Sequence, residues 1–215
     1  LARAKFICAL NDLLYRGGHT DIQTYQQEVG QVFGPELDVS ADPDGLCSKA
    51  DALTSLNQAL SDIPPPEDDE MFENAVALRW KSLSTALDAL TAATKLPDAD
   101  NLSKIHLGRG DVEMHRWRLG RAPWNHATAK QNGAMLLRNA QTYYRGATAL
   151  ARRDGAAEEE RDGTCKEAIA AAIEGQNTKL EQLKSTDLQQ VIVVAQDMVE
   201  DGMVVGRELS ALIST

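Results

Sequence analysis

Residues 188–212, LQQVIVVAQDMVEDGMVVGRELSAL, decide the fold class of this chain. The run 191–194, VIVV, could form a β-strand, because β-branched residues are enriched in strands. The wider pattern instead repeats every three or four residues, which is the spacing of apolar residues along one face of an α-helix. This spacing is carried by Leu188, Val191, Ile192, Ala195, Met198, Val199, Val205, Leu209 and Leu212. We therefore expect a helix through this stretch and no strand.

Helix-start signals recur toward the N-terminus. Asp42 followed by Pro43 fits an N-cap and a first helical position. The acidic run 67–70 suits the first turn of a long helix that ends near Lys95. Further helices are expected at 97–120, at 123–153 and behind the capping boxes Thr20/Gln23, Thr164/Glu167 and Thr186/Gln189.

These signals predict an all-α fold of seven to nine helices in antiparallel pairs. We expect a single domain over 1–215, with N-terminal helices in 1–62, helix pairs in 67–153 and C-terminal helices in 156–215. The chain has 215 residues, of which 43% are hydrophobic and 25% charged. This composition is too apolar for intrinsic disorder, and the length supports a core without a metal or a disulfide.

The cysteines and the hydropathy bear on the compartment. Cys8, Cys47 and Cys165 are odd in number and widely spaced, which is typical of free thiols in a reducing compartment. No run of 18 apolar residues is present, so we expect no membrane span. The sequence therefore predicts an intracellular protein of the cytoplasm or the nucleus.

Charge is distributed unevenly along the chain. The net charge is −10, yet residues 104–153, here called the basic segment, carry ten Lys or Arg against two acidic residues. Acidic clusters flank this segment at 62–73 and 154–162. The cations could pair with these clusters inside one domain, where exposed pairs stabilise by about 0–1 kcal/mol each. Alternatively, they form a basic face that binds an acidic protein segment.

Part of the chain, roughly 45–150, resembles the tetratricopeptide repeat, a helix pair in which small residues let the helices approach and a large residue fills the gap. Thr85, Ala89, Ala92 and Pro97 match one second helix, Leu107 and Gly108 match the next first helix, and Ala140, Tyr144 and Ala147 match its second helix. The interval from Asp111 to Ala140 is about twenty residues longer than in a regular repeat. An irregular helical bundle is the alternative arrangement.

The resemblance implies a right-handed superhelical array and a protein-interaction scaffold, whose first helices line a groove. Arg109 follows Leu107 and Gly108 and matches a groove-facing position of the family, and Lys104 lies nearby.

Arg and Trp side chains dominate binding hot spots, so those of the helix expected at 97–120 and the residues just after it are the predicted partner-binding residues. They are Lys104, Arg109, Arg116, Trp117, Arg118, Arg121 and Trp124. Glu113, beside Arg116 and Trp117, is expected at a solvated helix edge.

No catalytic residue, cofactor or metal site is predicted. The four histidines lack a metal-binding spacing, and the run 40–45 is better explained as a helix cap than as a calcium loop. The expected function is therefore an interaction scaffold without catalytic activity that binds an acidic segment of another protein. Three alternatives stay open: an RNA-binding helical repeat that uses the same basic face, a helical enzyme with Asp111 and His115 in its site, and self-association. The net negative charge argues against nucleic acid.

Overall fold

A computed structural model of the chain describes residues 39–61, 68–97, 101–207 and 209–210, and the single positions 18, 21, 24, 27, 28 and 31. Within these ranges no residue lies in a strand, which confirms the all-α prediction. The described helices are α3 (Pro43–Ser61), α4 (Asp69–Ala93), α5 (Leu102–Leu119), α6 (Ala127–Gln131), α7 (Gly133–Asp154), α8 (Ala157–Ile173) and α9 (Thr178–Glu200). Of the helix expected behind Thr20, the structure describes the single positions 24, 27, 28 and 31, all of which are helical. The Thr24 amide donates to Asp21 Oδ1 at 2.8 Å, one residue after the predicted cap.

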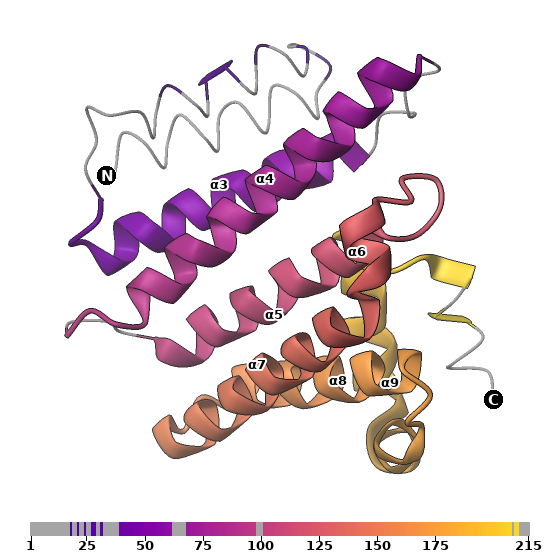
Figure 1. Cartoon of the computed structure of the whole chain (residues 1–215). Helices are drawn as coiled ribbons and strands as arrows, with labels where there is room; N and C mark the ends of the chain where they lie inside the picture. Colours follow the sequence, from indigo (N-terminus) through magenta and orange to yellow (C-terminus); the bar gives the residue numbers. More distant parts are fainter. Residues whose placement is uncertain are drawn as a thin grey trace. The chain divides into compact units, whose positions relative to one another are not determined.

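The chain forms two compact units, Leu1–Asp100 and Asn101–Thr215. Each is described by itself, and the expectation of a single domain stays a prediction. In the first unit, α3 and α4 form the antiparallel hairpin of Figure 1, with Leu56, Leu83 and Leu90 among the buried side chains.

Both helices of this hairpin begin where the sequence predicts. Asp42 Oδ1 accepts a hydrogen bond from the Asp44 amide (3.1 Å), so the run 40–45 serves as a helix cap. Asp68 is the N-cap of α4, and its Oδ1 accepts from the Met71 amide at 2.9 Å. An acceptor at this place satisfies one of the amides that a helix start leaves unpaired.

In the second unit α5 runs antiparallel to α7, and α7 antiparallel to α8, while α9 packs against α8 (Figure 1). The tightest approach joins α5 and α7, where the fully buried Tyr144 lies against Gly110. A Cβ atom on Gly110 would lie 2.6 Å from Cδ1 of Tyr144, too close for any larger residue. A glycine at position 110 therefore lets α5 and α7 approach closely. The resemblance to the tetratricopeptide repeat and the superhelical arrangement stay predictions.

The helix predicted over residues 188–212 is not continuous: it is broken at residues 201–205, and positions 206, 207, 209 and 210 are helical again. Helix α9 ends at Glu200, and Gly202 has φ +72°, a left-handed conformation that favours glycine. The amide of Met203 donates to the Met198 carbonyl (2.9 Å) and that of Gly202 to Val199 (3.0 Å). These two bonds form a Schellman motif, which ends α9 although the apolar spacing of the sequence continues beyond it.

Two predicted helix starts are also wrong. Helix α8 begins at Ala157, seven residues before Thr164, because Glu158, Glu159 and Glu160 favour a helix N-terminus. The Thr164 hydroxyl instead donates to the Glu160 carbonyl within that helix (2.7 Å). The helix expected from Pro123 is two helices, α6 and α7, separated at Asn132.

The helix cap predicted at Thr186 and Gln189 lies one residue later, at Asp187 and Gln190. Helix α9 is kinked at Asp187, which has non-helical backbone angles (φ −151°, ψ 68°). Asp187 Oδ1 accepts from the Gln190 amide at 3.0 Å and so caps the second half of α9.

Candidate functional site

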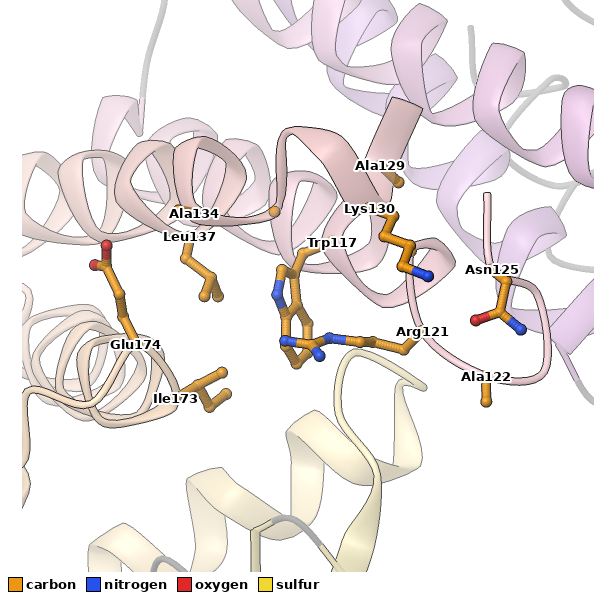
Figure 2. Close-up of a pocket in the computed structure, with 12 residues that line it drawn as sticks. Trp117, Arg121, Ala122, Asn125, Ala129, Lys130, Ala134, Leu137, Ile173 and Glu174 are labelled. Atoms are coloured by element: carbon orange, nitrogen blue, oxygen red, sulfur yellow. The ribbon is translucent and has the colours of Figure 1, made fainter. Parts of the chain in front are cut away.

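A pocket of about 440 Å³ opens in the second unit where α5 ends, α7 begins and α8 ends. Its walls come from these three helix ends, from the loop after α5 and from α6 (Figure 2). We call it the Trp117 pocket, because the indole of Trp117 forms its centre. Trp117, Leu137 and Ile173 supply apolar surface, and Arg121, Lys130 and Glu174 supply charge.

The connection between α5 and α7 builds one side of this pocket and is fixed by its own contacts. It falls within the interval that is longer than in a regular repeat. Arg118 Nη1 donates to the Ala122 carbonyl at 2.8 Å, and Trp124 is buried. His126 Nδ1 accepts from the Ala129 amide (3.3 Å) and caps α6. A Cβ on Gly120 would lie 2.8 Å from the Ala129 backbone, so loop and helix pack closely.

Two cations border the apolar surface. The Arg121 guanidinium lies 4.9 Å from the centroid of the Trp117 ring, within the range of a cation–π contact. Figure 2 shows the Arg121 side chain extended across the indole and Lys130 on the side of α6. Both side chains belong to exposed residues, and neither forms an ion pair with any residue that the structure describes.

The one carboxylate that lines the pocket is already compensated. Glu174 Oε1 accepts from Arg138 Nε at 2.8 Å, and Oε2 accepts from Gln141 Nε2 at 3.0 Å. Glu174 lies at the end of the pocket away from Lys130 in Figure 2. The pocket is therefore electropositive at the Arg121 end, and Leu137 and Ile173 supply part of its apolar wall.

Of the seven predicted partner-binding residues, two line the Trp117 pocket: Trp117, which is only 2% exposed, and Arg121. Lys130, the second cation, was not predicted as a binding residue. It follows Arg121 by nine residues, and the sequence does not show how the intervening loop brings the two side chains to one pocket. Arg118 and Trp124 do not line the pocket; they contribute to the packing of the loop after α5.

The other three predicted residues lie along α5 and have partners within the unit. Lys104 pairs with Glu159 on α8 at 3.4 Å. Arg109 stacks on the Tyr143 ring (4.0 Å to the centroid), and its Nη2 donates to the Tyr143 hydroxyl at 3.0 Å. Arg116 Nη1 donates to Glu113 Oε2 at 3.0 Å. Their charge is partly used inside the unit, so they are weaker anchors for a partner than Arg121.

Glu113 is not at a solvated helix edge. It is 1% exposed between α5 and α7, and its Oε1 accepts from Asn139 Nδ2 at 3.0 Å. Burial raises the pKa of the Glu113 carboxyl above its ordinary value, although Arg116 and Asn139 oppose that rise. The sequence did not indicate this burial, because a Glu three residues before an Arg on one helix is typical of an exposed ion pair.

Asp111 is half-buried and lies in a polar network that joins α5, α7 and α8. Its Oδ1 accepts from the Tyr144 hydroxyl (2.8 Å), and Lys166 Nζ lies 3.0 and 3.1 Å from its two carboxylate oxygens. Asp162 Oδ2 lies 3.5 Å from the same Nζ. Burial alone would lower the pKa of Lys166, but the carboxylates of Asp111 and Asp162 raise it well above its usual range. The lysine is therefore charged and joins α5 to α8.

No three His, Cys, Asp or Glu residues in the described part of the chain are arranged to hold a metal ion. None of the described helices is long and apolar enough to cross a membrane. No protein-family model, curated protein or solved structure matches this chain.

Proposed function

We propose that the second unit is a protein-interaction module, without catalytic activity, that binds an acidic segment of a protein at the Trp117 pocket. The observation that carries this proposal is the pair Arg121 and Lys130: two exposed cations at a pocket with both polar and apolar walls, without an ion pair in the described ranges.

The pocket chemistry suits a segment that carries carboxylates next to one large apolar side chain. The apolar side chain would lie beside Ile173, which is partly exposed, and at the edges of the buried Trp117 and Leu137, and its burial would add to the charge contacts. A carboxylate could then accept two parallel hydrogen bonds from Arg121, and a second could approach Lys130. Because these cations are exposed, they add more to specificity and association rate than to affinity.

The free thiols fit the intracellular compartment that we propose for this module. Cys165 is buried in α8, and burial raises its pKa to about 11, so little reactive thiolate forms at neutral pH.

A peptide titration tests the proposal. The probe is a fluorescent peptide of eight Glu residues around a central Leu, and the matched peptide carries Gln in place of every Glu. We expect the Glu peptide to bind in a salt-dependent manner, and the protein carrying Arg121→Gln and Lys130→Gln to bind it at least about tenfold more weakly, or about 1.4 kcal/mol. Arg153→Gln with Arg161→Gln is the matched control, because both residues are exposed in the same unit and lie outside the pocket lining.

Equal affinity of the pocket variant and the wild type for the Glu peptide would contradict the proposal. Stronger binding of a single-stranded RNA, lost in the same variant, would favour the RNA-binding alternative.

A further inference from the structure

The first unit presents an acidic surface with an apolar residue in its centre. At the start of α4, residues Asp68–Glu73, here called the acidic turn, place Asp69, Glu70 and Glu73 in solvent around Met71, which is 62% exposed. No other exposed large apolar residue in the described ranges has a higher exposed fraction.

The charges of the acidic turn have no counter-ions in the described residues. Asp68 is used as the helix cap, whereas Asp69, Glu70 and Glu73 form no ion pair there. Negative charge at a helix N-terminus is stabilised by the helix dipole, so this cluster does not require cations for folding. Its carboxylates are therefore available to a partner.

We infer that the Trp117 pocket of one copy of the chain receives the acidic turn of a second copy. This inference rests on the proposed function, and it names the acidic segment. Met71 would enter the pocket beside Ile173 and the edge of Trp117, since methionine is flexible and its thioether makes favourable contacts at the edges of aromatic rings. Asp69 and Glu70 would then lie near Arg121 and Lys130, so that each surface supplies the charges that the other lacks.

The two surfaces are different parts of the chain, which determines the type of assembly. Such a contact is heterologous: a bound copy still offers a free pocket and a free acidic turn. We expect assemblies that grow with protein concentration and shrink with added salt, because exposed charges are screened.

A complementation experiment with the full chain tests this inference. The pocket variant carries Arg121→Gln and Lys130→Gln, and the turn variant carries Asp69→Asn, Glu70→Gln and Glu73→Gln. By sedimentation velocity, the wild type should form concentration-dependent assemblies and each variant alone should be monomeric. An equimolar mixture should form dimers and nothing larger, because it contains one intact pocket and one intact turn per pair. Circular dichroism melting of both variants checks that they fold.

Three outcomes would overturn the inference: a wild type that stays monomeric at all concentrations, a variant that associates as the wild type does, or a mixture that stays monomeric. Binding of the Glu peptide to the turn variant separates this inference from the proposed function. If that variant binds the peptide but the wild type does not associate, only the second-copy inference fails. If it does not bind the peptide, the proposed function fails as well.

Discussion

Two regions around α5 hold charge in opposite ways. Between α5, α7 and α8, Tyr144 and Lys166 are buried and Asp111 is half-buried, and each of these side chains has a partner at 2.8–3.1 Å. At the end of α5, Arg121 and Lys130 border the Trp117 pocket and remain exposed. The charged side chains between the helices are therefore partnered inside the unit, whereas the two cations at the Trp117 pocket are exposed. Substitutions in the first region should change stability, and those in the second should change binding.

The largest effect is expected from Lys166→Met. The methionine retains the apolar stem but leaves Asp111 and Asp162 without their cation, and breaking a buried pair typically destabilises by about 3–5 kcal/mol. We expect a loss of about 3 kcal/mol at pH 7, measured by urea unfolding. Lys104→Met is the matched control: its side chain is 64% exposed in the pair with Glu159, and the change should be within about 1 kcal/mol. Similar losses in both variants would show that burial does not distinguish the two pairs.

The second effect concerns the contact of α5 with α7. Gly110→Ala should destabilise by about 1–3 kcal/mol, because the new methyl group collides with the ring of Tyr144. Gly133→Ala adds the same methyl group where the nearest atom lies 3.8 Å away, so it should be neutral or slightly stabilising. Thermal unfolding of both variants measures the difference. An unchanged melting temperature for Gly110→Ala would mean that α5 and α7 can separate without loss.

A smaller, pH-dependent effect is expected at Glu113. Its pKa is raised in the folded protein, so the folded state holds that proton more tightly than the unfolded chain. The stability of the wild type relative to Glu113→Gln should therefore fall as the pH rises from about 4.5 through the raised pKa. Urea unfolding of both proteins between pH 4 and pH 7 measures this slope. A flat or rising difference would mean that the hydrogen bonds from Arg116 and Asn139 outweigh the burial.

The smallest effect on stability belongs to the pocket. Arg121→Gln with Lys130→Gln should change the free energy of unfolding by no more than about 1 kcal/mol, because both residues are exposed and only the cation–π contact of Arg121 is lost. The same pair of substitutions should weaken peptide binding about tenfold. A destabilisation comparable with that of Lys166→Met would place these cations in the structural region instead.

Helix type and most helix positions were predictable from local signals. The cap at Asp42, the acidic start of α4 and the three-to-four spacing in α9 act within one or two turns, so they can be found in the sequence. The errors lie where a neighbouring signal is stronger. Glu158–Glu160 start α8 ahead of Thr164, and the Schellman motif at Gly202 ends α9 within an apolar pattern.

The pocket was predictable only in part. Trp117 and Arg121 follow from residue type and from their place at the end of a helix. Lys130 and Glu174 join them through the turns between α5, α6, α7 and α8, and no local pattern indicates such contacts. The burial of Glu113 could not be predicted from the sequence either, because its amide partner Asn139 lies 26 residues away. Side-chain partners far apart in sequence are set by packing.

The contact of Gly110 with Tyr144 also constrains how this protein can evolve. A larger residue at position 110 requires a smaller ring at position 144 or a wider spacing of the two helices. A smaller residue at 144 would also remove the hydroxyl that donates to Asp111. In any set of descendants of this chain, positions 110, 111 and 144 should therefore change together, and their covariation would mark a relative even after the remaining sequence has diverged.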